Sequence, residues 1–109
     1  MTCYAIGNLR DVEMGRDIVA YLEAIDATLA PFGGRFAIHG GQKHMLEGAN
    51  TGDLIAIAFP DMAKAKAWYA SPAYQNILPL RTRNAIGEVF LIEGVGSSHK
   101  ATDILKRAV

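Results

Sequence analysis

Residues 59–85 read FPDMAKAKAWYASPAYQNILPLRTRNA, and most of the expected architecture follows from this stretch. Pro60 ends the strand before it, because proline cannot donate a backbone hydrogen bond to a neighbouring strand. Asp61 is a favourable N-cap, and the alanine-rich run after it predicts a helix to about Ala70. The stretch therefore begins where a strand gives way to a helix.

A second helix is expected directly after the first. Serine is favoured at the N-cap and proline at the first helical position, so Ser71 and Pro72 predict a new helix start. Pro79 is expected to kink or shorten this helix. Arg81 and Arg83 follow on the helix or just after it, shortly before the next strand.

Upstream of this stretch, the sequence predicts a strand at residues 3–9 and a helix at residues 15–32. Apolar residues in the helix recur at spacings of four, three and four, which places them on one face. They are Ile18, Leu22, Ile25 and Leu29. Pro31 and the following pair of glycines end the helix.

A short strand is expected at residues 35–39. In an extended chain successive side chains point to opposite faces, so Phe36 and Ile38 should share one face and Ala37 and His39 the other. The glycine pair that follows predicts a bulge or a sharp bend.

Two further strands are expected at residues 53–59 and 88–93. An extended run at 42–47 and a turn at 48–52 connect the strand at 35–39 to the strand at 53–59. The order strand, helix, strand, strand, helix, strand is that of the ferredoxin-like βαββαβ fold. We therefore expect an α+β protein with a four-stranded antiparallel sheet and its helices on one face.

The segments LIAIAF and VFLI, within these last two strands, are apolar throughout. An antiparallel sheet with one solvated face would alternate apolar and polar residues. The simplest cover for the second face is the same face of another copy, related by a two-fold axis. The sequence therefore predicts a homodimer through the open sheet face.

Length and net charge limit the number of domains and the kinds of partner. The 109 residues suit one domain, which we expect at residues 1–95 with a tail at 96–109 whose last part, 101–109, suits a short surface helix. Eleven basic and eleven acidic residues give no net charge, which argues against a nucleic-acid partner. The aliphatic strands also argue against RNA binding on the sheet.

Cysteine usage and the absence of targeting signals indicate a cytoplasmic protein. The single cysteine, Cys3, excludes an internal disulfide and fits a reducing compartment. The N-terminal residues predict no signal peptide. No apolar run reaches the length of about 18 residues that a membrane span requires, so no membrane association is expected.

Several short motifs have a recognisable order and spacing. They are GGRF at 33–36, HGG at 39–41, LEG at 46–48, IAFPD at 57–61 and AWYASPAYQ at 67–75, followed by Arg81. Together they resemble the domain-of-unknown-function family numbered 1330, in the dimeric α/β-barrel superfamily. The resemblance covers about residues 3–95, and the SPAYQ block is its most specific part.

The resemblance implies a dimeric α/β barrel but no single activity, because the superfamily includes cofactor-free monooxygenases, isomerases, haem proteins and ligand-sensing modules. Two departures bear on the ligand. Members of the family often carry an arginine where this chain has His39. They also often carry a tryptophan and an arginine where residues 49–54 read ANTGDL.

The implied fold usually holds a cavity between the helices and the sheet, and we expect the catalytic and binding residues there. His39 would act as acid or base, Tyr74 as a hydrogen-bond donor, and Arg81 as the anchor for a carboxylate. The other residues expected to contact substrate are Phe59, Trp68, Tyr69 and Asn8, with Tyr4 nearby on the first strand.

Structural alternatives stay open for these residues. Trp68 suits the core, with Tyr69 turned about 100° away towards a partner subunit or the cavity mouth. His39 alternatively bonds to a turn. Arg81 alternatively forms a salt bridge, and its possible partners are Glu47, Asp53 and Glu88.

No metal or other cofactor is expected. His39 and His44 stand five residues apart, and no carboxylate or cysteine completes a metal-ligand spacing. Two functions remain open. One is a cofactor-independent enzyme acting on a small organic acid or aromatic metabolite, and the other is a non-catalytic, ligand-binding or stress-related homodimeric module.

Overall fold

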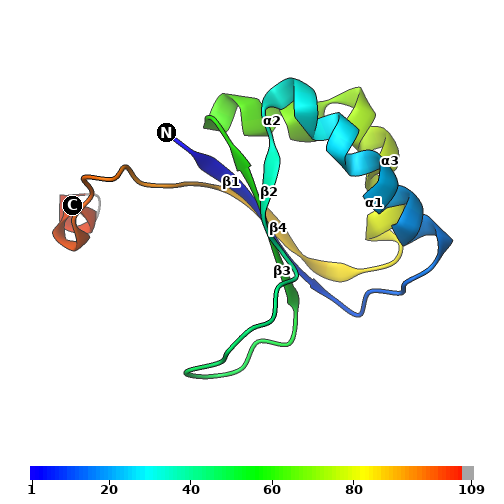
Figure 1. Cartoon of the computed structure of the whole chain (residues 1–109), viewed down its shortest axis with the longest axis horizontal. Helices are drawn as coiled ribbons and strands as arrows, with labels where there is room; N and C mark the ends of the chain where they lie inside the picture. Colours follow the sequence, from blue (N-terminus) through cyan, green and yellow to red (C-terminus); the bar gives the residue numbers. More distant parts are fainter. Residues whose placement is uncertain (107–109) are drawn as a thin grey trace.

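The computed structural model describes residues 1–106, which form one four-stranded sheet covered on one side by helices (Figure 1). The strands are β1 (Cys3–Arg10), β2 (Arg35–His39), β3 (Asp53–Phe59) and β4 (Ile86–Glu93). The helices are α1 (Arg16–Leu29), α2 (Met62–Ala70) and α3 (Pro72–Thr82), with short 3-10 helices at Ala30–Phe32 and Ala101–Lys106.

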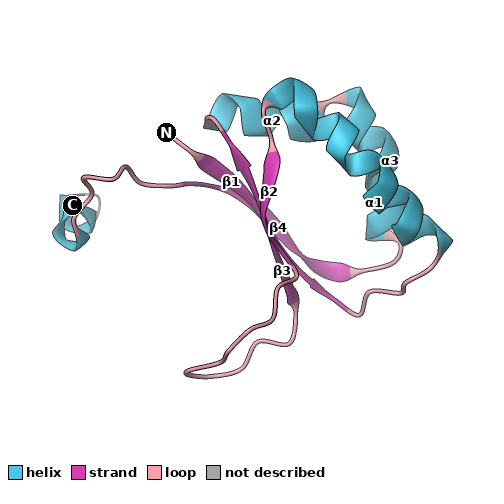
Figure 2. Ribbon diagram, in the orientation of Figure 1, coloured by secondary structure: helices cyan, strands magenta, loops and turns pink. Residues whose placement is uncertain are grey.

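The sheet has the order β2-β3-β1-β4, and each neighbouring pair is antiparallel. Figure 2 shows the strands in magenta and the helices α1, α2 and α3 in cyan, on one side of the sheet. The βαββαβ order predicted from the sequence is thus confirmed, and the chain has the ferredoxin-like α+β fold. Within residues 1–106, no helix has both the length and the apolar character needed to cross a membrane.

The two faces of the sheet follow from its register. Ala5 on β1 lies opposite Ile57 and Leu91, and these three side chains belong to or pack against the core beneath the helices. The next residue along β1, Ile6, pairs with Ala56 and Phe90 and points to the other side. We call this other side the open face, because the helices leave it uncovered (Figure 1).

Both predicted helix starts are confirmed. The Asp61 carboxylate accepts a hydrogen bond of 2.8 Å from the backbone N–H of Lys64, and the Ser71 hydroxyl accepts one of 3.3 Å from that of Tyr74. Such caps satisfy backbone donors that have no partner within the helix. Of the two effects expected of Pro79, a kink or a shortened helix, the shortening does not occur, because α3 continues to Thr82.

The buried face of α1 differs from the predicted one by a residue. Tyr21 is only 8% exposed, whereas Leu22 is 39% exposed and borders a cavity. The helix also buries Thr28, whose hydroxyl accepts a 3.0 Å hydrogen bond from the Trp68 indole and donates one to the Ile25 carbonyl. These bonds satisfy polar groups that would otherwise be costly to bury.

The predicted alternation of β2 is wrong at one point. The pairing with β3 shifts register between Phe36 and Ile38, so Ala37 is the extra residue of a bulge. Phe36 and His39 consequently point to the same side, where their rings stack with centroids 4.3 Å apart. The glycine pair after β2 contributes a bend at Gly40, which has a φ of 65°.

Two segments project from the body (Figure 1). Residues 40–52 form a long loop rather than the extended strand-like run expected at 42–47. The ammonium of Lys43 ties this loop together by donating to the side chain of Asn50 and to the carbonyl of Gly52. The other segment is the tail, whose predicted helix at 101–109 is a 3-10 helix at 101–106; residues 107–109 lie outside the described part of the chain.

Candidate functional site

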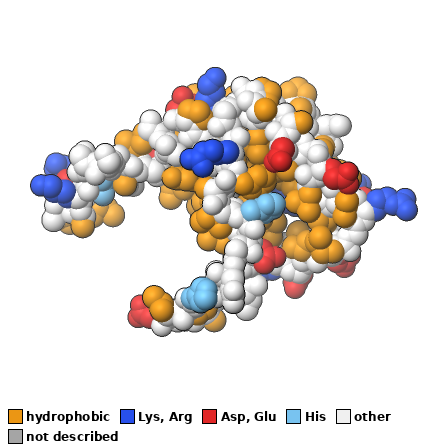
Figure 3. Space-filling view, viewed as in Figure 1, with side chains coloured by type: hydrophobic (Ala, Val, Ile, Leu, Met, Phe, Trp, Pro, Cys, Tyr) orange, Lys and Arg blue, Asp and Glu red, His pale blue; other side chains and the backbone are white. Residues whose placement is uncertain are grey.

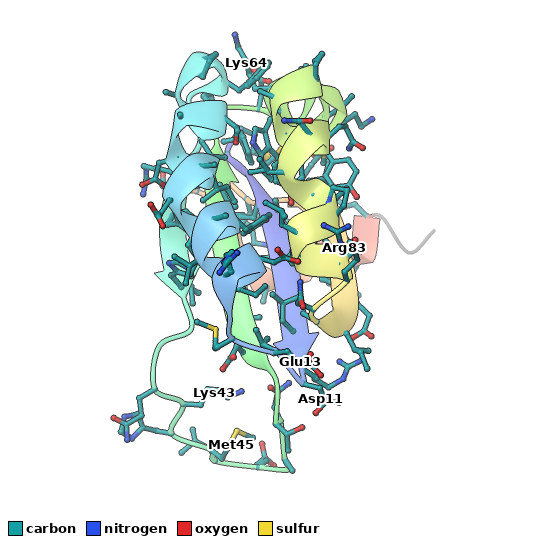
Figure 4. All side chains as sticks on the ribbon, turned by 90° about the vertical axis from the view of Figure 1, so that its right-hand side faces the viewer. Asp11, Glu13, Lys43, Met45, Lys64 and Arg83 are labelled. Carbon is teal, nitrogen blue, oxygen red and sulfur yellow. The ribbon has the colours of Figure 1, made fainter. Side chains whose placement is uncertain are left out.

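A cavity of about 280 Å³ lies between the sheet and the helices α1 and α3, which pack side by side over β1 (Figure 4). This volume is close to the lower end of the range for small-molecule sites, about 300–1,000 Å³. Most of the lining is aliphatic, from residues such as Ile18, Ile25, Ile57 and Val89. The polar side chains that line it are Tyr21, Tyr74, Arg81, His39 and Asp53.

Two of these polar groups form a buried pair. The hydroxyl oxygens of Tyr21 and Tyr74 lie 2.8 Å apart, and the rings meet edge to face at 71°. The two side chains are 8% and 2% exposed. Burial, and then the neighbouring Tyr74, raise the pKa of Tyr21 above its ordinary value. Tyr21 is therefore a neutral phenol at physiological pH.

Arg81 places a positive charge beside this pair. Its guanidinium carbon lies 6.0 Å from the centroid of the Tyr21 ring, at the limit of a cation–π contact. Burial favours the neutral form of Arg81, but the nearby phenols of Tyr74 and Tyr21 outweigh it and raise the pKa. The guanidinium is thus a half-buried, permanent cation.

Arg81 forms no ion pair with any aspartate or glutamate in residues 1–106. Of the three partners considered from the sequence, Glu88 instead makes a bidentate pair with Arg10, at 2.7 and 2.9 Å. Arg83 approaches Asp17 at 3.8 Å. The salt bridge considered as the alternative role of Arg81 is therefore not formed within residues 1–106.

His39 lies at another part of the cavity wall, at the end of β2. It is exposed, and its ring stacks on Phe36 at an interplanar angle of 15°. Gly40 and Asp53, the residues at the base of the projecting loop, line the cavity beside it. The bulge in β2 thus turns the imidazole to the helix side of the sheet.

The aromatic candidates divide between core and surface. Trp68 is 2% exposed and forms part of the inner cavity wall, so it belongs to both the core and the site. Phe59 packs on Trp68 with centroids 5.3 Å apart and is core, away from the cavity lining. Tyr69 is 37% exposed, contacts Trp68 and Tyr74 from outside, and also does not line the cavity.

Asn8 does not lie in the cavity, and that expected placement is wrong. It pairs with Leu54 and Glu88 in the sheet register and so points to the open face, as does Tyr4. Strand alternation decides this, because Cys3, Ala5, Gly7 and Leu9 take the helix side. The Asn8 side-chain oxygen has no hydrogen-bond partner within residues 1–106.

Tyr21 is the site residue that the sequence analysis missed. It lies three residues after Ile18 and four before Ile25, so it shares their helical face. Leu22 fits the same apolar spacing, so the pattern alone favours Leu22. For cofactors, residues 1–106 contain no group of three or more His, Cys, Asp or Glu side chains positioned to hold a metal ion.

Solved structures with similar folds come from several bacteria. A protein of unknown function from Rhodopseudomonas palustris is 17% identical with a TM-score of 0.64, covering 87% of this chain and 83% of that one. A dimeric ferredoxin-like protein of unknown function from Jannaschia sp. CCS1 is 15% identical with a TM-score of 0.59, covering 86% and 100%. SnoaB, a cofactor-independent oxygenase from Streptomyces nogalater, is 11% identical with a TM-score of 0.60, covering 91% and 98%.

Sequence comparison identifies the family. No curated protein matches the chain. Residues 2–95 match the family described as domain of unknown function DUF1330, which spans most of the 109 residues and confirms the resemblance noted in the motifs. The chain therefore belongs to the DUF1330 family.

Proposed function

We propose that the helix–sheet cavity binds a small organic acid, and that the protein is a cofactor-independent enzyme acting on it. The observation that carries the proposal is Arg81, a half-buried cation with no acidic partner among residues 1–106. Burial of an unpaired charge is costly. A ligand carboxylate would supply the missing partner, through the paired hydrogen bonds that guanidinium groups make.

The rest of the cavity suits an apolar body attached to that carboxylate. Its aliphatic walls and the inner face of Trp68 would bury rings or short chains. An ion pair formed in such surroundings is stronger than one in water, because water screens it less. The small volume favours ligands at the lower end of metabolite size.

His39 is the proposed acid or base, and Tyr74 the proposed hydrogen-bond donor. An imidazole titrates near neutral pH and so can take up or deliver a proton under ordinary conditions. Its place on the cavity wall supports this role. SnoaB, similar in fold at 11% identity, is a cofactor-independent oxygenase, so the fold accommodates such chemistry.

A non-catalytic, ligand-binding module is the second candidate. His39 favours it in one respect, because its side chain makes no hydrogen bond to another group in residues 1–106. A catalytic imidazole is commonly oriented by such a bond. In this case the cavity would bind the same acids without turnover.

Thermal melting with matched acids and amides tests the carboxylate site that both candidate functions share, and turnover of a bound acid separates the two. Benzoate and phenylacetate should raise the melting temperature, whereas benzamide and phenylacetamide should not, since only the acids satisfy Arg81. If acids and amides act alike, the proposed carboxylate site is wrong. For any acid that is turned over, His39→Ala should abolish turnover and preserve binding. His44→Ala is the control, because His44 lies on the projecting loop.

We also propose that the protein is a homodimer formed through its open face. Apolar side chains from all four strands contribute to this face: Tyr4, Ile6, Ile38, Leu54, Phe90 and Ile92. Phe90 and Ile92 are each 49% exposed in the single chain. The projecting loop and tail also carry hydrophobic side chains (Figure 3), which supports a partner lying between them.

A further inference from the structure

The hydroxyls of Tyr21 and Tyr74 hold one more proton than their mutual hydrogen bond uses. Each hydroxyl carries one proton, so the pair has two. The 2.8 Å contact between the oxygens uses one of them. Within residues 1–106, neither hydroxyl makes a further hydrogen bond to an acceptor. The second proton is therefore free to be donated.

Among residues 1–106, no acceptor takes this proton. Both side chains are more than nine-tenths buried, and both line the cavity. Arg81 lies beside the pair, and its guanidinium carries donors only. An acceptor atom on a bound ligand would take this proton and remove the free-energy cost of a buried donor without an acceptor.

We propose that the tyrosine pair and Arg81 together bind one oxyanion of the ligand, with the free phenol proton donated to the oxygen that Arg81 neutralises. This rests on the proposed function and specifies its ligand. The cavity would take an apolar molecule that bears a carboxylate, enolate or phenolate oxygen at one end. Neutral analogues lack the negative oxygen that both donors require.

The pairing of two tyrosines adds strength and direction to this donor. The hydroxyl that accepts the internal bond becomes a better donor to the ligand, because hydrogen bonds in a chain polarise one another. Tyr21 stays protonated, since burial and then Tyr74 raise its pKa. Whichever hydroxyl touches the ligand, the other orients it and acts as a positioning residue.

A phenol whose two protonation states differ in colour reports directly on the proposed oxyanion site. The probe is 4-nitrophenol, titrated while bound to the full-length protein, and the readout is its apparent pKa when bound. An oxyanion site lowers this value below that of free 4-nitrophenol. Tyr21→Phe and Tyr74→Phe should each raise the apparent pKa of bound 4-nitrophenol by about half a pH unit to one pH unit, the effect of losing one hydrogen bond.

Two controls separate this effect from a structural one. Tyr4→Phe, on the open face, should leave the apparent pKa unchanged. The neutral ether 4-nitroanisole should bind the wild type and both cavity variants equally, since it carries no oxyanion. Thermal melting checks that the variants fold, and either cavity variant alone suffices for the test.

The outcomes are distinct. If neither 4-nitrophenol nor the carboxylates bind, the proposed function fails and this inference fails with it. If 4-nitrophenol binds with the same apparent pKa in the wild type and in the folded Tyr21→Phe or Tyr74→Phe variant, the cavity binds the phenol, but the proposed oxyanion site of Tyr21, Tyr74 and Arg81 is wrong. Equal losses for 4-nitrophenol and 4-nitroanisole would likewise contradict the inference, because they would indicate packing alone.

Discussion

The hydroxyl oxygens of Tyr21 and Tyr74 lie 2.8 Å apart and join α1 to α3 across the buried wall of the cavity. The two residues are 53 positions apart in the chain. Arg81, one helical turn beyond the middle of α3, lies beside them with its guanidinium near the Tyr21 ring. This contact between two helices thus creates one polar corner of a mostly aliphatic cavity.

Alkaline stability should depend on Tyr21. Its pKa in the folded protein is raised by burial and by Tyr74, so it stays protonated where an unfolded tyrosine ionises, above about pH 10. The unfolded chain then binds fewer protons than the folded one, and the free energy of unfolding falls by about 1.4 kcal/mol per pH unit for this group. Below pH 10 the group causes no such loss.

The Tyr21→Phe variant lacks this titration. Urea unfolding measured at several pH values around and above pH 10 should therefore show a shallower decline for the variant than for the wild type. Near neutral pH, the free energies of unfolding of the two proteins should differ by an amount that does not change with pH. Parallel declines above pH 10 would show that the phenol ionises as easily in the folded state as in the unfolded one.

Gly34→Ala should destabilise the fold. A Cβ at this position would lie 2.7 Å from the Phe59 ring and 2.8 Å from a methyl carbon of Leu29, both of them core residues. Overpacking of this kind costs about 1–3 kcal/mol. Gly41→Ala is the matched control, because a Cβ there would meet no atom within 4 Å. Chemical denaturation of both variants checks the difference, and equal midpoints would contradict the packing described.

Phe90→Glu should dissociate the proposed homodimer. The side chain lies on the open face opposite Ile6, so a carboxylate there would be buried without a partner in the interface. Val19→Glu is the control, because Val19 is similarly exposed, at 47%, but lies on α1. Sedimentation velocity should give a dimer for the wild type and the control and a monomer for Phe90→Glu. A wild-type monomer at low micromolar concentration would refute the interface.

Local sequence signals were sufficient for the order of elements and for both helix starts. Pro60-Asp61 and Ser71-Pro72 act through their own backbone and side-chain chemistry, so their effect is visible without tertiary information. The apolar character of β3 and β4 likewise indicated a sheet with two faces to cover.

The details of the site depend on register, which local patterns do not fix. The bulge at Ala37 reverses the side to which His39 points, and nothing in the residues RFAIH distinguishes a bulged strand from a regular one. The expectation that Asn8 lines the cavity is wrong, because the alternation of β1 directs its side chain to the open face. The sequence pattern does not single out Tyr21, because Leu22 fits the same apolar spacing and only packing against α3 selects between them.

The central claim is that Arg81 anchors a ligand anion, and the most direct test is calorimetric titration of benzoate into the wild type, Arg81→Met and Arg83→Met. Both substitutions remove one positive charge, but Arg83 lies outside the cavity lining, 3.8 Å from Asp17. We expect Arg81→Met to weaken binding about ten- to a hundred-fold, as loss of a charge-assisted contact predicts, and Arg83→Met to leave it nearly unchanged. Equal affinities in all three proteins would contradict the account.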